Sequence, residues 1–258
     1  MRQGQDRILT THVGSLPRSQ AVTDVLFARE RGEVRDRAAD ALTLAEAVRE
    51  VVRRQVDIGL DIVSDGEMSK ISYATYVADR FSGFAGDTPR EPGQDLVEFP
   101  GLLRKLAERG STAKYRRPRC VSAITVKDTA PVTADLANLR AAIAAAGALQ
   151  GFMNAASPGV IALFQPNDYY RTQDEYLEAL AAALQSEYEA ITRAGIILQR
   201  RQECFVSREK RKKGEEDTYE KSVYHRSISE LKPPNPSGAC IVLAGSIFHS
   251  EPFTRNRY

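Results

Sequence analysis

Tryptophan is absent from this 258-residue chain, and cysteine, histidine and methionine occur only three times each. Three cysteines cannot form a fully paired disulfide framework, so we expect a reducing, cytoplasmic location. Three histidines leave little material for Cys–His catalysis, and the motifs CxxC, HExxH and GxxxxGKS/T do not occur. Motifs therefore predict no catalytic residue and no metal ligand.

Long apolar runs and an excess of one charge are also missing. No apolar run reaches the roughly 20 residues that span a bilayer, and the N-terminal stretch MRQGQDRILTTHVG lacks the apolar segment of a signal peptide. The chain has 36 lysine and arginine residues against 34 aspartate and glutamate residues, a net charge of +2. We therefore expect small-molecule partners, and neither nucleic acid nor a membrane.

Strand-like and helix-like segments alternate from residue 8 to residue 199. Runs rich in β-branched residues predict strands, and apolar residues three and four apart predict helices. The expected strands are 8–15, 60–67, 119–126, 152–160 and 196–199, and the expected helices are 41–58, 100–109, 135–151 and 172–195. Such alternation is typical of parallel βαβ units and predicts an α/β fold.

Three of the expected strands have small or polar residues at their carboxyl ends, namely Val13-Gly14-Ser15, Ser64 to Glu67, and Asn154 to Pro158. Ligands collect at the carboxyl ends of strands in parallel α/β folds. Gly14 would let a ligand approach the backbone, although a plain tight turn explains it equally well. Glu67 would point into the strand-end cleft and bind an amine or transfer a proton. Alternatively it complements a helix N-terminus, a role that Asp65 could also fill.

Arg119 and Cys120 open the expected strand 119–126. The planar guanidinium of Arg119 suits an anionic or heteroaromatic ligand. Cys120 is either a small core residue or a nucleophile, and a nucleophile needs a nearby base that the sequence does not show.

Several stretches together resemble the C-terminal catalytic domain of cobalamin-independent methionine synthase and its stand-alone relatives. In chain order they are TTHVGSLPRS, GLDIVSDGEMSK with YVADRFSGF, RPRCVSAITVKD, ASPGVIALFQPNDYY with EYLEALAAALQSEYEAI, and AGIILQ. The resemblance covers about residues 8–199 and implies a TIM-type (β/α) barrel. It also implies transfer of a methyl group from 5-methyltetrahydrofolate, often polyglutamylated, to the thiol of homocysteine. Zinc binds the thiol sulfur in the family, and methionine is the product.

The same resemblance implies which residues bind the substrates. Val13-Gly14-Ser15 would hold the amino-acid end of homocysteine, and Glu67 would bind its amino group. Arg119 and Cys120 match the pair that touches the folate. The segment around Phe164 and Gln165 lies where the family carries a folate-stacking tryptophan, which is absent here and leaves the methyl donor open.

After Gln199 the sequence departs from the family. The strand should continue as LQ-hydrophobe-Asp-x-Pro, and later strands should supply a His-x-Cys pair, a Glu and a further Cys for zinc. Arg200 and Arg201 follow instead, no His-x-Cys occurs, and the remaining candidates are scattered, namely Cys204, His225, Cys240 and His249. We therefore expect residues 1–199 to form about the first half of a barrel. Residues 200–258 should form a divergent, charged and Pro-rich tail that is disordered or poorly packed, with 241–248 as a candidate strand.

Beside nucleic-acid binding by the basic part of the tail, which would weaken steeply with salt, three functions stay open at this point, and so does the question whether the chain is an enzyme. The first is a methyltransferase of the methionine synthase class that is inactive as written because the zinc ligands are not found. The second is a zinc-dependent thiol alkyltransferase that acts on another thiol. The third is a non-catalytic half-barrel that binds a partner or a small ligand. A frameshift, an unspliced intron or a gene-model error would produce the change of character after residue 199.

Overall fold

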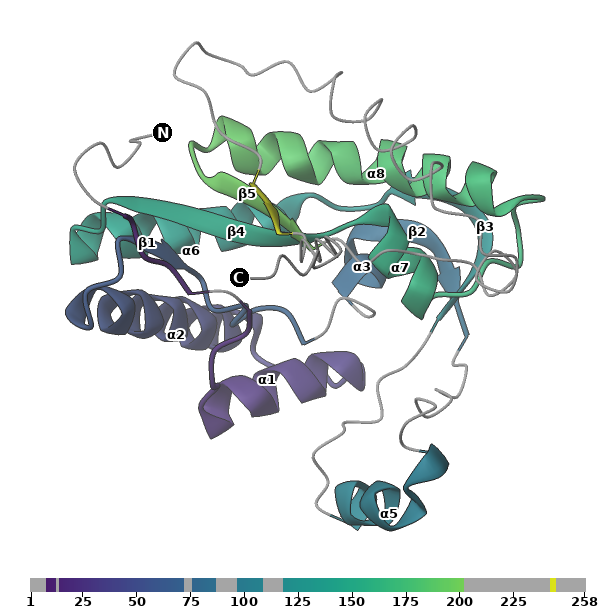
Figure 1. The fold of residues 1–258 in the computed structure, drawn as a ribbon, viewed down its shortest axis with the longest axis horizontal. Coiled ribbons are helices and arrows are strands. Elements are labelled where there is room, and N and C mark those ends of the chain that lie inside the picture. The colour runs from purple at the N-terminus through teal and green to yellow at the C-terminus, as the bar shows by residue number, and fades with distance from the viewer. Residues whose placement is uncertain are drawn as a thin grey trace, which may run out of the picture.

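The structure is a computed structural model, and it describes residues 8–12, 14–71, 76–86, 97–108, 118–201 and 242–244. Its centre is a four-stranded parallel sheet with strand order β1-β4-β5-β6 (Figure 1). The strands are β1 (Ile62–Ser64), β4 (Gln150–Ala156), β5 (Ile197–Arg201) and β6 (Val242–Ala244). The expected strand 8–15 is not formed in the described residues, where a single isolated parallel bridge joins Thr11 to Ile62 of β1. The predicted α/β class with parallel strands is therefore confirmed.

Three long helices pack against this sheet: α2 (Arg37–Asp57), α6 (Ala130–Ala146) and α8 (Gln173–Arg193) (Figure 1). Their apolar stripes bury large side chains against the strands. The core includes Leu44, Val48 and Val52 of α2, Leu136 and Leu139 of α6, Leu180, Leu184 and Ile191 of α8, and Val63, Met153 and Leu198 of the sheet. Each such side chain contributes about 1.5–3 kcal/mol when it is fully buried, so this layer holds the strand ends in place.

The two faces of the sheet differ in character. A Cβ atom at Gly151 would lie 2.2 Å from Cδ1 of Ile143 in α6, so position 151 faces the helices. Arg200 also faces them, because its guanidinium lies 5.4 Å from the ring centre of Tyr188 in α8. Side chains alternate along a strand, so Asn154 and Gln199 point to the opposite side. We call the side that carries Asn154 and Gln199 the inner face.

Strand β3 (Arg119–Val126) corrects the sequence prediction. Residues 119–126 were expected to lie within the parallel series, but β3 pairs antiparallel with β2 (Phe81–Ala85) in a separate two-stranded sheet. Most of β3 is exposed or half-buried, whereas a central parallel strand is buried on both faces. Gly83 allows the close pairing: its φ is +101°, and a Cβ there would lie 2.9 Å from two carbonyl oxygens of β3.

Most of the other expected elements are confirmed with shifted ends. Helix α8 begins after Thr172, whose side chain accepts a hydrogen bond from the Glu175 backbone N–H, as the capping signal predicted. The expected strand 152–160 ends at Ala156, and α7 (Pro158–Phe164) follows it. β5 continues to Arg201, two residues past the expected limit, and part of 241–248 forms β6. The predicted division at residue 199 stays a prediction, since 202–241 and 245–258 lie outside the described residues.

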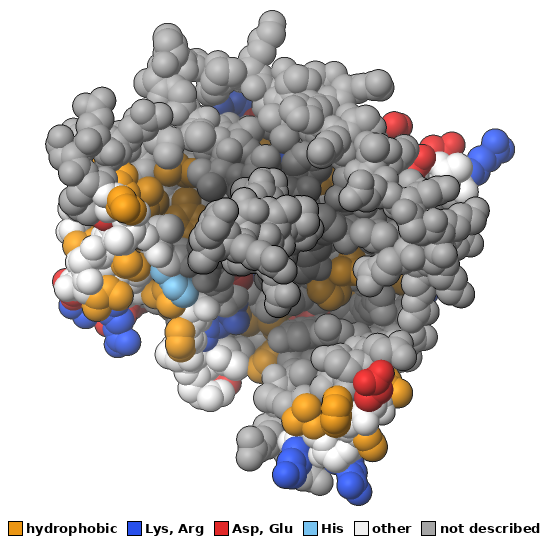
Figure 2. All heavy atoms as spheres, viewed as in Figure 1, with side chains coloured by type: hydrophobic (Ala, Val, Ile, Leu, Met, Phe, Trp, Pro, Cys, Tyr) orange, Lys and Arg blue, Asp and Glu red, His pale blue; other side chains and the backbone are white. Residues whose placement is uncertain are grey.

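Three further helices complete the described structure: α1 (Gln20–Glu30), α3 (Tyr76–Arg80) and α5 (Pro100–Glu108). The expected helix 100–109 corresponds to α5, whereas α1 and α3 were not predicted. Helix α5 projects from the body in Figure 1, and apolar and basic side chains lie side by side on it in Figure 2. None of the helices in the described ranges is long and apolar enough to cross a membrane.

Candidate functional site

Glu67 lies in a tight turn directly after β1. The Asp65 side chain accepts a hydrogen bond from the Glu67 backbone N–H (2.9 Å). Residues 66–69 form a turn and not a helix, so this contact stabilises a turn and the helix N-terminus considered from the sequence is not found there. Gly66 and Glu67 both have positive φ, +61° and +57°. A non-glycine residue in the left-handed region is uncommon and costs about 1–3 kcal/mol. The backbone of Glu67 is therefore strained, and this strained turn sets the direction of its carboxylate.

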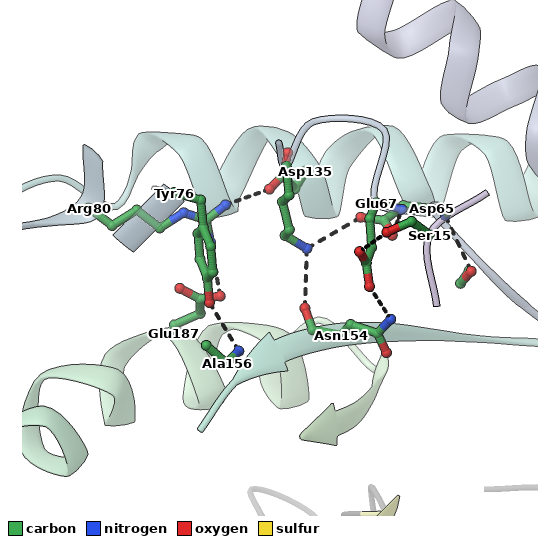
Figure 3. Close-up of polar contacts among 12 residues, drawn as sticks. Ser15, Asp65, Glu67, Tyr76, Arg80, Asp135, Asn154, Ala156 and Glu187 are labelled. Carbon is green, nitrogen blue, oxygen red and sulfur yellow. Dashed lines mark hydrogen bonds and ion pairs between the residues drawn. The ribbon is translucent and has the colours of Figure 1, made fainter. Parts of the chain in front are cut away.

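The Glu67 carboxylate is oriented by two neutral donors from distant parts of the chain (Figure 3). Ser15 donates its hydroxyl proton to Oε2, and the Asn154 amide donates to Oε1 at 2.7 Å. Glu67 is only 6% exposed. The two hydrogen bonds reach different oxygens, so they fix the direction of the carboxylate. The segment after residue 13, the β1 turn and the inner face of β4 thus meet at one carboxylate.

A buried lysine, Lys70, contacts both this turn and strand β4. The Lys70 ammonium lies 3.5 Å from Asp65 Oδ2 and donates to the Asn154 carbonyl at 3.2 Å. Burial alone would lower the pKa of Lys70, but the attraction of Asp65 and Asp135 outweighs it, so the pKa is raised and the group stays charged. Lys70 therefore connects the two elements that position Glu67.

Arg18 holds the same turn from the N-terminal side. Its guanidinium donates to the carbonyls of Glu67 (2.8 Å) and Lys70 (2.6 Å). The Leu16 backbone N–H donates to the Gly66 carbonyl at 3.1 Å. Both contacts tie the segment after Ser15 to the turn after β1, so Ser15 is placed beside Glu67 by backbone geometry.

A second buried ionic cluster lies next to the first (Figure 3). Arg80 at the end of α3 pairs with Asp135 of α6 (2.7 Å) and Glu187 of α8 (2.9 Å), and its guanidinium stacks 4.7 Å from the ring centre of Tyr76. Burial opposes the charged form of Arg80, but Glu187 and Asp135 outweigh it and raise its pKa. The Tyr76 hydroxyl accepts from the Ala156 backbone N–H at 3.0 Å, so the cluster also fixes the carboxyl end of β4.

Arg119 and Cys120 belong to β3 of the antiparallel sheet, a different sheet from the one that carries β1 and β4 (Figure 1). Arg119 donates to both carboxylate oxygens of Asp168, 2.5 Å to Oδ1, and this hydrogen bond lowers the pKa of Asp168. Cys120 is fully buried, and burial raises the pKa of its thiol to about 11. The thiol is therefore neutral near pH 7, which favours the core reading over the nucleophile.

The structure thus unites some of the predicted site residues and separates others. Ser15 and Glu67 touch, and Gly14 beside them has a φ of +95° with open space around its Cβ position. Val13 lies outside the described residues. Asn154, Lys70 and Arg18 contact the site but were not selected as site residues from the sequence.

The described residues do not fit a zinc site. Within them no group of three or more histidine, cysteine, aspartate or glutamate side chains is placed to hold a metal ion. Cys120, the described cysteine, is buried on β3 with its thiol protonated. Cys204, His225, Cys240 and His249 lie outside the described residues. No metal-dependent step is therefore assigned to the side chains described.

The oriented Glu67 carboxylate lies just after β1, at the carboxyl end of a strand in the parallel sheet. Proteins of the barrel and open-sheet α/β classes bind their ligands at this end of the sheet. Residues 8–91 match the family described as "Cobalamin-independent synthase, Catalytic domain". The predicted resemblance to this catalytic domain is confirmed over that part of the chain.

Curated and solved relatives agree with this match. A methionine synthase of Sulfolobus acidocaldarius is 25% identical over 187 residues, which are 72% of this chain and 49% of the relative. A 5-methyltetrahydropteroyltriglutamate–homocysteine methyltransferase of Bradyrhizobium diazoefficiens is 34% identical over 84 residues, 33% of this chain and 11% of the relative. A B12-independent methionine synthase from a Shewanella species, solved with selenomethionine, superposes with a TM-score of 0.62 at 18% identity, over 86% of this chain and 58% of that one. The chain spans about half the length of the archaeal relative that it matches over most of its own length.

Proposed function

We propose that this chain carries the amino-acid-binding half of a methyltransferase that moves a methyl group from 5-methyltetrahydrofolate to the thiol of homocysteine. The observation that carries the proposal is the Glu67 carboxylate, held by Ser15 and Asn154 at the carboxyl ends of parallel strands. The family match over residues 8–91 and the shared fold support it. On this view residues 1–199 form about the first half of a TIM-type barrel, and the protein acts in the cytoplasm.

The proposed site recognises the amino-acid end of homocysteine by charge and shape. Glu67 accepts hydrogen bonds from the α-ammonium group, and a charge-assisted hydrogen bond of this kind contributes about 1.5–3 kcal/mol. Gly14 and Ser15, with Val13 before them, offer backbone N–H groups to the α-carboxylate. Because Ser15 and Asn154 already orient Glu67, little side-chain entropy is lost when the ligand binds.

Arg119 is the residue proposed to bind the folate substrate. Its side chain is 35% exposed beside Asp168, so the guanidinium is accessible to an anionic or heteroaromatic ligand. Cys120 follows it in the strand but is buried, so a contact between its thiol and folate stays a prediction. The zinc that the family uses would keep the homocysteine thiol deprotonated when bound. The described residues hold and orient the amino acid, and no described residue is assigned to the metal.

Calorimetric titration of the purified full chain with L-methionine and L-homocysteine tests the proposal. We expect binding of both, and a loss of at least about tenfold in affinity for Glu67→Gln, because the variant replaces a charged acceptor with a neutral amide. Glu178→Gln, an exposed position on α8, is the matched control and should bind like the wild type. Equal affinity of the Glu67→Gln variant and the wild type contradicts the proposed site.

A turnover assay separates the remaining functions. Formation of methionine from methyl-folate and homocysteine, with zinc supplied, supports the methyltransferase. Alkylation of a different thiol supports the second function inferred from the sequence. Amino-acid binding without turnover of any thiol supports the non-catalytic half-barrel.

A further inference from the structure

Gln199 lies beside the Glu67 site, on the neighbouring strand. Its Cα is the register partner of Asn154, and Asn154 is the residue that donates to Glu67. Paired residues of adjacent parallel strands point to the same side of a sheet. Gln199 therefore shares the inner face with Asn154, whereas Arg200 turns to the helices and lies over Tyr188.

The amide oxygen of Gln199 is buried and unsatisfied. The residue is only 8% exposed, and Oε1 has no hydrogen-bond partner in the part of the chain that the structure describes. Buried side-chain oxygens are nearly always hydrogen-bonded, and each exception calls for an explanation. Packing alone would be served better by an apolar side chain of similar size, because a buried polar atom without a partner opposes folding.

The chemistry next to Gln199 identifies the missing donor. Glu67 Oε1, 2.7 Å from the Asn154 amide, places a carboxylate one strand away from the Gln199 side chain. An ammonium group has three N–H donors, so it can serve a carboxylate and a neutral oxygen together. A hydroxyl group has one donor, which goes to the charged acceptor because charge-assisted hydrogen bonds are stronger.

We propose that Gln199 is a specificity-determining residue of the Glu67 site and accepts a hydrogen bond from the α-ammonium group of the bound amino acid. The proposal rests on the proposed function and adds to it the selection of α-amino acids over α-hydroxy acids. Glu67 provides the attraction for the cation, and Gln199 distinguishes a group with several donors from a group with one.

The test is a titration of the full chain with two probes, L-methionine and its analogue that carries a hydroxyl in place of the α-amino group. We expect Gln199→Leu to weaken binding of L-methionine about tenfold and binding of the hydroxy acid by no more than about twofold. Gln150→Leu is the matched control: it makes the same change at the far end of β4, where Gln150 donates to the Gly195 carbonyl. That variant should leave both affinities unchanged.

Each other outcome has a defined meaning. Equal weakening of both probes by Gln199→Leu shows a packing effect and overturns the proposal, as does unchanged binding of L-methionine. If Glu67→Gln weakens binding and Gln199→Leu does not, the proposed function stands and this inference alone fails. If the wild type binds neither probe, both fail. Should Gln199→Leu lose its far-ultraviolet circular dichroism, Gln199→Met, which keeps the length of the side chain, is measured in the same way.

Discussion

Replacing Lys70 with methionine should destabilise the protein and loosen its site. Methionine keeps the length and most of the apolar volume of lysine but removes the charge. Lys70 and Asp65 are 3% and 2% exposed, and the ammonium also donates to the Asn154 carbonyl at 3.2 Å. The change therefore leaves Asp65, which accepts a hydrogen bond from the Glu67 backbone N–H, as a buried carboxylate without its cation.

The size of the effect follows from the separation of 3.5 Å between Lys70 Nζ and Asp65 Oδ2. At an effective dielectric constant of about 20, two unit charges at this distance attract by about 5 kcal/mol. Part of that attraction is offset because methionine avoids the cost of burying an ammonium group. Breaking a buried pair by removing one partner costs about 3–5 kcal/mol, and the long separation favours the lower end, about 3 kcal/mol.

The assay is urea denaturation of the full chain at pH 7, with wild type, Lys70→Met, and Lys70→Met combined with Asp65→Asn. The double variant should recover part of the lost stability, because it removes the uncompensated charge. Lys105→Met on the exposed surface of α5 is the control and should change the free energy of unfolding by less than about 0.5 kcal/mol.

The pH dependence provides an independent check. The folded-state pKa of Lys70 is raised, so its stabilisation is fully present below the unfolded-state value of about 10.4 and is lost as the pH rises through the folded-state pKa. The difference between wild type and Lys70→Met should therefore be constant from about pH 6 to pH 9. A difference under about 1 kcal/mol at pH 7, or one that declines across this range, would refute the reasoning.

Three further predictions follow from the buried groups. Arg80→Met should lower the free energy of unfolding by about 3–5 kcal/mol in urea denaturation, because it leaves the buried carboxylates of Asp135 and Glu187 without their cation. A loss under about 1 kcal/mol would show that water already screens these charges. Gly151→Val should cost about 1–3 kcal/mol through the clash with Ile143, and adding Ile143→Val should restore part of it; no recovery would place the strain elsewhere. Cys120 should react with iodoacetamide at least about 300-fold more slowly than a free cysteine near neutral pH, because its pKa is about 11 rather than about 8.5. Mass spectrometry of its peptide measures that rate, and labelling as fast as in urea would contradict the burial.

Local signals in the sequence predicted much of the helical layer. The Thr172 cap and the glycines at 59 and 195 mark the ends of α2 and α8, and both glycines have positive φ in the structure, +86° and +74°. Helix α1 was not predicted, although Ser19 caps it by accepting from the Val22 backbone N–H. Its cap was a visible signal, but the apolar pattern behind it is weak.

Pairing between distant segments was beyond the reach of local patterns. The antiparallel partner of β3 is β2, and Phe81 pairs with Val126 across the whole segment that contains α5. A sequence clue did exist: Ser122 and Thr125 break the apolar run that a doubly covered parallel strand needs. The expectation that 119–126 joins the parallel series failed because strand propensity carries no information about the partner.

The candidate site shows the same division. Glu67 and Ser15 could be selected because each closes a strand or precedes a turn, and the structure brings them into contact. Asn154 stood in the third polar strand end, but its contact with Glu67 depends on the register between β1 and β4. Lys70 and Arg18 resemble ordinary surface cations in the sequence, since nothing local shows that they are buried among carboxylates and carbonyls.

Because β1 pairs with β4, which is far along the chain, the site can form only after β4 has been synthesised. Ile62 of β1 pairs with Gln150 of β4, and the Asn154 amide that donates to Glu67 also belongs to β4. Ribosomes add roughly 5–20 residues per second, so the strand and its carboxylate emerge on the order of 5–20 s before their partners. During that interval the nascent chain presents an incomplete sheet, the situation in which chaperones bind hydrophobic segments. Slow codons placed shortly after β4 would give this sheet time to close, whereas slow codons placed before it would prolong the exposure.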